Sequence, residues 1–346
     1  MLQKNDFAVY WVAFEWPLEI TKVKLRSLQV LPLFGLLAFA MAFISQLSAQ
    51  NLTLEGQTGG FITPTAYVVY TAKGQFFSHP AVGVHYINTA KVIGNIETYS
   101  FLEGFANRAE IGYTRSVHQT GQETTGLDLS SLWQYNGMNI FSGKVVAVKD
   151  GQGIGWMPGV AVGGVLRTND RFVSGALNQE FTGVLKNYTN GDAYVAVSKT
   201  RLKLPVPFLA NVGWKATNAS IFGIGGQSTR FSGRFFGGLG IPLPFFFHTA
   251  VVPAVGATQE PPQVKNLGAI LVSGSAHLPT TLDYAVRVTQ KENPHFAADI
   301  GFGHVAGTIG STVVPTGLPA PYPPYAVLPI NLQANKVFGC GLSFRY

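Results

Sequence analysis

The chain has 346 residues, of which 47% are hydrophobic and only 12% are charged, and its formal net charge is +7. Charged residues make up about a quarter of an average soluble domain, so the composition argues against an ordinary water-soluble protein. The basic residues form no dense Lys/Arg run, which excludes an obvious nucleic-acid partner. A single cysteine, Cys340, excludes an internal disulfide.

Residues 1–49 form an N-terminal extension that contains a predicted signal peptide. Three basic residues between Lys22 and Arg26 precede the apolar run Leu28–Ile44, and the small and polar stretch Ser45–Ala49 follows. This order is typical of a secretory signal with cleavage after Ala49. An uncleaved membrane anchor is the alternative, since Leu47 is large for a position just before a cleavage site. A translation start at Val23 would give a more usual signal.

The rest of the chain combines an apolar composition with the absence of helical membrane spans. Beyond residue 44 no apolar run reaches the roughly 18 residues that a spanning helix requires. In lipid the backbone must then be satisfied by a closed β-barrel, in which every strand is paired. The sequence therefore predicts an all-β, up-and-down antiparallel barrel in the outer membrane over residues 76–346.

Residues 50–75 come before the barrel and are rich in Gly, Thr and small side chains. Two interpretations remain open for this segment. It is either a linker in the periplasm or a partial plug of the barrel lumen.

From residue 76 the main signal is alternation of apolar and polar residues in segments of about ten, the length of a tilted membrane strand. We predict twelve strands, although ten or fourteen also fit the pattern. Their approximate ranges are 76–88, 92–105, 108–118, 139–149, 159–168, 192–200, 208–217, 230–240, 245–255, 281–290, 295–304 and 336–346.

The predicted connections alternate between short and long, as expected for short periplasmic turns and longer external loops. The short connections are 106–107, 150–158, 201–207, 241–244 and 291–294, and the long ones are 119–138, 168–191, 218–229, 256–280 and 305–335. Five prolines between Pro315 and Pro324 would stiffen the last loop and suit a segment presented at the cell surface.

Period-2 alternation also predicts which charged side chains face the lumen, because they cannot face hydrocarbon at acceptable cost. Strand four stays ambiguous, since Lys144 and Lys149 fall on opposite faces. Arg115 interrupts an apolar face and should lie near an interface, where it can reach water. The lumen-lining candidates are Glu110, Arg167, Lys215, Arg234, Asp283, Arg287 and Asp299.

Three of these candidates are acidic and four are basic. A strongly anion-selective pore would need a clear excess of Arg or Lys. Near balance instead favours cross-strand ion pairs that brace the interior around a narrow path.

The last strand places its apolar side chains on one face and ends on an aromatic residue. Outer-membrane proteins as a class end in this way, and the resemblance implies a signal read by the barrel-assembly machinery. Its residues here are Phe338, Leu342, Phe344 and Tyr346. Cys340 on the same face is then a small apolar residue.

Two further stretches resemble known outer-membrane families. Gly56–Ala66, with its Gly-rich and Thr-Pro-containing sequence, is similar to the opening of exopolysaccharide-associated barrels of the YjbH type and of related uncharacterised families. Asn107–Glu110 resembles the turn that enters an early strand of such barrels. The resemblance covers about 56–118 and the C-terminal strand, and it implies no catalytic residue.

No residue pattern indicates enzymatic or metal chemistry. The seven histidines show no metal-ligand spacing, so we expect neither a metal nor a cofactor. Ser232 and His248 lie on neighbouring predicted strands and suggest a hydrolase as a minor alternative. We expect the protein not to be an enzyme.

The sequence thus predicts an integral outer-membrane barrel that acts as a small passive, porin-like channel or as a structural protein of the envelope. The alternative is a barrel associated with polysaccharide export or surface binding. The expected partners are outer-membrane lipid, the assembly machinery, and small solutes or polysaccharide.

Overall fold

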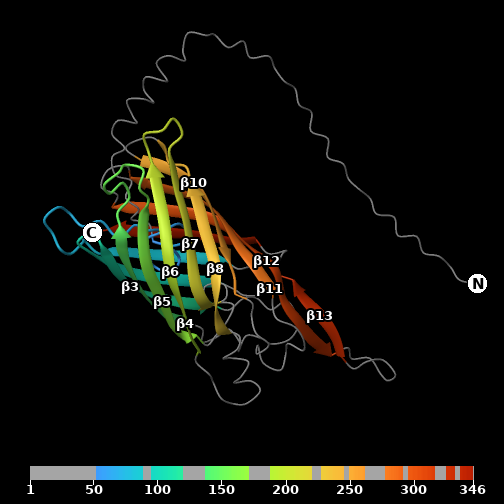
Figure 1. Ribbon diagram of the computed structural model, residues 1–346. Helices are drawn as coiled ribbons and strands as arrows, with labels where there is room; N and C mark the ends of the chain where they lie inside the picture. The colour runs from blue at the N-terminus through green and yellow to red at the C-terminus, as the bar shows by residue number, and fades with distance from the viewer. Residues whose placement is uncertain are drawn as a thin grey trace, which may run out of the picture. The chain divides into compact units, whose positions relative to one another are not determined.

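The computed structural model describes residues 52–88, 95–119, 137–170, 188–219, 227–244, 249–261, 277–290, 295–315, 325–331 and 336–345. These residues belong to one compact unit, and the ribbon in Figure 1 shows a barrel of long strands. No helix in these ranges is long and apolar enough to cross a membrane. The predicted signal peptide lies outside the described residues and stays a prediction.

The strands run in chain order around the sheet. They are β1 (Ala81–Asn88), β2 (Asn95–Phe105), β3 (Ala109–Gln119), β4 (Gly137–Val148), β5 (Gly159–Asp170), β6 (Tyr188–Arg201), β7 (Phe208–Ala219), β8 (Gln227–Gly240), β9 (Leu243–Pro244), β10 (Thr249–Gln259), β11 (His277–Gln290), β12 (Phe296–Pro315), β13 (Tyr325–Asn331) and β14 (Lys336–Arg345).

Twelve of these strands close into an antiparallel barrel, as the sequence predicted. β9 and β13 stand apart, since β9 pairs with β10 and β13 with β12. The last strand returns beside the first, with Ala81 opposite Arg345 and Asn88 opposite Phe338. On its other side β14 pairs with β12, so the circle is complete. The C-terminal strand therefore closes the barrel beside the first strand, as the sequence predicted.

The long connection predicted at 305–335 is wrong in part. β12 continues to Pro315. Thr308 pairs with both β11 and β13, and the residues from Ser311 onward pair with β13 instead of a barrel strand. Proline is tolerated in strands with an unpaired edge, and Pro329 lies in the two-stranded ribbon that β12 and β13 form. The Pro-rich composition had concealed this ribbon. The predicted ninth strand is also displaced, because β10 spans Thr249–Gln259 instead of 245–255.

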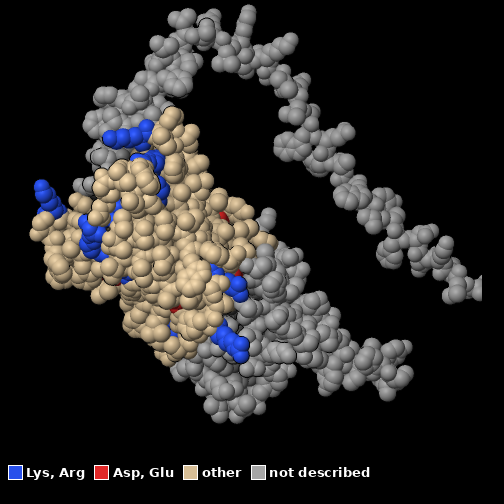
Figure 2. Space-filling model, in the orientation of Figure 1, with Lys and Arg blue, Asp and Glu red and all other residues tan. Residues whose placement is uncertain are grey.

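The outer face of the barrel is apolar on every barrel strand, because alternation turns one side chain in two outward. One exposed apolar residue from each strand, between 38 and 64% exposed, makes the point: Val84, Phe101, Tyr113, Phe141, Val162, Val195, Val212, Phe235, Val255, Val286, Ile300 and Phe344. In Figure 2 this wall is mostly free of charge, with Lys and Arg at its margins. Such a surface is suited to hydrocarbon rather than to water.

Arg115 is the exception on the outer face of β3, and its position agrees with the prediction. It lies four residues before the end of the strand and donates to Oδ1 of Asn139 on β4 at 3.0 Å. The hydroxyl of Tyr113 donates to the same oxygen at 3.0 Å. The guanidinium is thus held by polar partners near one rim of the barrel.

Substituting Val212 by Arg should destabilise the barrel if its outer face meets lipid. Val212 is 62% exposed and lies within β7. A basic side chain at the bilayer midplane costs about 2–4 kcal/mol, so we expect the free energy of unfolding in phospholipid vesicles to fall by a comparable amount. Leu204→Arg is the control, since Leu204 is 43% exposed but lies in the turn between β6 and β7. Equal, small effects of both substitutions would contradict a lipid-facing wall.

Candidate functional site

The lumen of the barrel contains part of the same chain. We call Leu52–Ser78 the lumen segment; it is buried or half-buried from Leu52 to Ala72, and exposed over residues 73–77. It folds back on itself through bridges between Leu52 and Thr58 and between Gly59 and Pro64. Gly56 has a φ of +78°, and a Cβ atom there would lie 2.1 Å from Oγ1 of Thr114 on β3. Glycine is required here both by the backbone conformation and by the close approach to the wall.

Glu110 on β3 is the first of two charged anchors for the lumen segment. Its carboxylate accepts the backbone N–H groups of Thr58 and Val69, each at 3.1 Å, and also the hydroxyl of Thr58. Lys144 on β4 forms an ion pair with it at 2.9 Å and donates to the carbonyl of Thr58 at 2.9 Å. Both charged side chains are almost completely buried, so strand and segment share one desolvated cluster.

Arg167 on β5 is the second charged anchor, and its side chain is 0% exposed. It donates to both carboxylate oxygens of Glu55 in the lumen segment, at 2.5 and 2.8 Å. It also pairs with Asp192 on β6 at 2.8 Å and donates to Asn190 at 3.3 Å. The planar guanidinium thus joins two wall strands to the segment through bidentate geometry, for which Arg is well suited.

Further hydrogen bonds extend the contact around the wall. Each joins the lumen segment to a different part of the barrel: Tyr194 Oη to Gln57 Oε1 at 2.6 Å, Ala66 N to Ser198 Oγ at 2.8 Å, Asn211 Nδ2 to Pro64 O at 2.9 Å, Arg287 Nη1 to Gly59 O at 3.1 Å, and Thr71 N to Asn107 Oδ1 at 2.6 Å. The lumen segment is therefore hydrogen-bonded to several strands around the wall and not only to the charged anchors.

Apolar packing accompanies the polar contacts. Leu54, Ile62 and Val68 of the lumen segment belong to one buried cluster with Ile140 and Val146 of β4. A segment that only linked the barrel to its N-terminal extension would not need such packing. These contacts favour the plug over the linker for the predicted segment 50–75, of which the described part begins at residue 52.

Tyr67 joins the segment to the short-connection end of the barrel. Its hydroxyl donates to Oδ2 of Asp150 at 2.8 Å and lies 2.6 Å from the Thr200 hydroxyl. Burial raises the pKa of Tyr67 well above its usual range, so the phenol stays neutral and available as a donor. Lys199 also pairs with Asp150, which makes this aspartate a shared acceptor.

The seven lumen-lining candidates differ in their surroundings. Glu110, Arg167, Lys215, Asp283 and Asp299 are buried, whereas Arg234 and Arg287 are half-buried. Cross-strand ion pairs do form, but their partners were mostly missed. Of the predicted candidates only Arg287 and Asp299 pair with each other, through two bonds at 2.5 and 2.8 Å.

Glu55, Lys144 and Asp192 complete the other pairs and were absent from the candidate set. Lys144 was left out because Lys149 falls on the opposite face of the same strand, so the inward face stayed ambiguous. The structure shows that both faces of β4 are largely apolar: Met138, Ile140 and Val146 are buried inside, while Phe141 and Val145 are exposed outside. The inner apolar face packs against the lumen segment, which the period-2 pattern of one strand cannot show. No local sequence signal could have identified Glu55.

The predicted assembly signal faces outward where it is described. Phe338, Leu342 and Phe344 are between 38 and 49% exposed, and Tyr346 lies outside the described residues. Recognition of this strand by the assembly machinery stays a prediction.

The Ser232–His248 pair receives no support from the strand register. β8 pairs with β10 from Ala254–Gly240 to Thr258–Phe236. Ser232 lies beyond the end of this pairing at which Thr258 is found. Residue 248 comes before the other end of β10, and it is outside the described residues. The two positions are therefore at opposite ends of the paired strands. The described residues also contain no group of His, Cys, Asp or Glu that could hold a metal ion.

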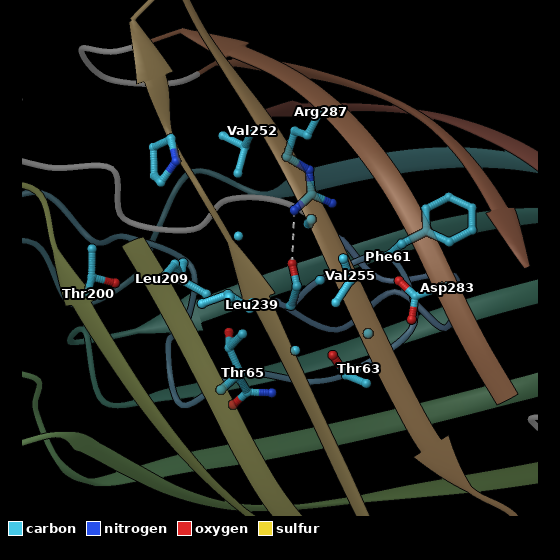
Figure 3. A pocket seen from close by; sticks show the side chains of 18 of the residues that line it. Phe61, Thr63, Thr65, Thr200, Leu209, Leu239, Val252, Val255, Asp283 and Arg287 are labelled. Atoms are coloured by element: carbon cyan, nitrogen blue, oxygen red, sulfur yellow. Dashed lines mark hydrogen bonds between the residues drawn. The ribbon is translucent and has the colours of Figure 1, made fainter. Parts of the chain in front are cut away.

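A pocket lies between the lumen segment and the wall from β6 to β11, and its empty space is about 830 Å³ with open solvent at its mouth included. Figure 3 shows its lining, with Phe61, Thr63 and Thr65 from the segment and Asp283 and Arg287 from β11. The charged anchors Glu110 and Arg167 lie on β3 and β5, away from this pocket. The segment is thus held by charges on one side and borders open space on the other.

A closed twelve-stranded antiparallel barrel with an apolar outer wall and charged groups buried inside has the architecture of a transmembrane β-barrel. The chain belongs to the family described as "Protein of unknown function (DUF3034)", whose model matches residues 49–234. No curated protein matches the chain.

Several solved barrels are similar to this chain. The KdgM porin is 7% identical with a TM-score of 0.40, over 77% of this chain and 99% of that chain. The NanC porin is 9% identical with a TM-score of 0.42, over 77% of this chain and 100% of that chain. The β-domain of the Bordetella autotransporter BrkA is 12% identical with a TM-score of 0.33, over 77% of this chain and 98% of that chain.

Proposed function

We propose that the protein is an outer-membrane channel for small polar solutes whose lumen is closed at rest by the lumen segment. The observation that carries the proposal is the polar attachment of that segment, above all the ion pair between Glu55 and Arg167. Ion pairs and hydrogen bonds can be exchanged for water when a segment moves. The wall that remains would present fixed charges and hydroxyls, which suit a hydrophilic path.

The distribution of anchors indicates where a path would open. The charged anchors come from β3 to β6, whereas the pocket borders β6 to β11. We infer that solutes pass along the inner faces of β7 to β11, where Asp283, Arg287 and Asp299 lie.

A structural role in the envelope predicts a different behaviour, since a purely structural barrel needs no movable segment. The alternative of polysaccharide export or surface binding finds support in the ribbon of β12 and β13. From Ser311 to Pro315, β12 pairs with β13 and no longer with β11 or β14, and an extended ribbon suits contact with a partner. The resemblance of Gly56–Ala66 to YjbH-type barrels stays a prediction, and it favours the same alternative of polysaccharide export.

Conductance through planar bilayers tests the channel proposal. The wild-type protein should show mainly closed traces with brief discrete openings. Glu55→Gln keeps the shape of the side chain but removes its charge, so the segment should detach more often and the open fraction should rise at least tenfold, which corresponds to about 1.4 kcal/mol. Glu97→Gln is the matched control, because Glu97 accepts from Tyr99 on the exposed face of β2.

Two results would count against the proposal. If well-folded wild type and Glu55→Gln both lack discrete openings, the barrel is not a channel. If the wild type conducts steadily and Glu55→Gln does not change its open fraction, the lumen segment does not close it.

A further inference from the structure

Asp283 is a buried carboxylate that the ion pairs of the lumen do not use. It lies on the inner face of β11, opposite Gly256 of β10, and is 4% exposed. Its Oδ1 atom has no hydrogen-bond partner among the residues that the structure describes. An ionised carboxylate only accepts hydrogen bonds, and burying it without a donor is costly. A bound ligand that donates a hydrogen bond to this carboxylate would reduce the cost.

The nearest cation of the same strand is already engaged. Arg287 follows Asp283 by four residues and so lies on the same face of β11. Its guanidinium donates twice to Asp299 and once to the carbonyl of Gly59. The charge of Arg287 is thus balanced by Asp299, and the Oδ1 atom of Asp283 has no hydrogen-bonded cation among the described residues.

The other side chains of the pocket offer little competing recognition. The hydroxyls of Thr65 and Thr289 donate to the carbonyls of Thr58 and Phe296 at 3.3 and 3.2 Å. The amide of Asn211 donates to Pro64. Phe61, Leu209 and Val252 supply apolar surface in the same pocket, as Figure 3 shows. The lining is therefore largely apolar, and among the buried side-chain atoms that the structure describes in it, only Oδ1 of Asp283 lacks a partner.

We infer that this pocket binds a small alkylammonium ion. The ammonium group donates to Asp283, and the alkyl chain lies against Phe61, Leu209 and Val252. Charge-assisted hydrogen bonds of this kind are short and strong, and a mostly apolar lining with a few placed polar groups is typical of small-ligand sites. The inference deepens the proposed function, on which it rests, because it names small organic cations as the solute class that the lumen selects.

Isothermal titration of the folded full-length protein in detergent micelles tests the inference. The probes are propylammonium, the neutral 1-propanol and the anionic propionate, which share a chain length. We expect propylammonium to bind at least tenfold more tightly than either of the others. Asp283→Asn should reduce its affinity at least tenfold, while Glu97→Gln, on the outer face of β2, should leave it unchanged. Equal binding of propylammonium and 1-propanol to the wild type would overturn the inference, whether or not the variant folds.

A second variant tests the position of the carboxylate without removing its charge. A Cβ atom at Gly256 would lie 2.1 Å from Oδ1 of Asp283, so Gly256→Ala must displace that carboxylate. We expect it to weaken propylammonium binding at least tenfold. Gly143→Ala is the matched control, since a Cβ there meets only the Glu110 carbonyl, at 3.9 Å. Unchanged binding to a folded Gly256→Ala variant would exclude Asp283 as the recognition group.

The titration is independent of conductance. Binding of propylammonium without channel openings would support the site and contradict the channel. Channel openings without preferential binding of propylammonium would support the channel and contradict the site.

Discussion

Substituting Arg167 by Met is expected to lower the free energy of unfolding in phospholipid vesicles by about 3–5 kcal/mol. Arg167 is completely buried between Glu55 and Asp192. Met retains much of the side-chain volume, so lost packing contributes little. The two carboxylates would be left buried, close to one another and without their shared cation. Guanidinium titrations followed by tryptophan fluorescence would measure the loss.

The effect of Arg167→Met should be largely reversed by removing the charges that it exposes. We expect the triple variant with Glu55→Gln and Asp192→Asn to be more stable than Arg167→Met alone, since no uncompensated charge then remains. A double-mutant cycle between Glu55 and Arg167 should give a clear coupling energy. Wild-type stability of the single Arg167→Met variant would show that the ion pair does not hold the segment in place.

Substituting Glu110 by Ala is expected to release the lumen segment most directly. This carboxylate accepts from the backbone of Thr58 and Val69 and balances Lys144. Its loss leaves a buried ammonium and two unpaired N–H groups, so a cost of about 3–5 kcal/mol is expected. Amide hydrogen exchange of peptides covering Leu52–Ser78 should become at least tenfold faster, because exchange reports local opening.

Controls separate release of the segment from unfolding of the barrel. Exchange in β7 and β11 should stay slow in Glu110→Ala, and addition of Lys144→Met should recover part of the lost stability. Glu97→Ala should have an effect within about 0.5 kcal/mol, as is usual for surface substitutions. Exchange that accelerates equally in the segment and in all strands would indicate global destabilisation and would contradict a locally held segment.

The two charged anchors have a common consequence for function. Both lie on the β3–β6 side of the lumen, where the segment also contributes to the apolar cluster with Ile140 and Val146. The pocket with Asp283 lies on the other side. A barrel built in this way can stay closed and stable while one side of its lumen admits a ligand.

Local sequence patterns were sufficient to predict the fold class and the order of the barrel strands. In β7, Val212 and Trp214 alternate with Asn211 and Lys215, and the structure turns the first pair outward and buries the second. Such alternation is a local property, because successive side chains of a strand point to opposite faces and only one face meets lipid. The alternation in the C-terminal strand is also a local pattern, and its pairing with β1 follows because the barrel is closed.

The position of the lumen segment and its ion pairs with the wall could be learned only from the three-dimensional structure. Glu55 and Arg167 are separated by 112 positions in the sequence, and no periodicity relates residues so far apart. The face of Lys144 was hidden for the same reason, since the inner side of β4 is apolar only because the lumen segment packs on it. Strand patterns report which face meets lipid. The interior depends on which distant segments share it, and that is fixed by long-range packing and charge pairing.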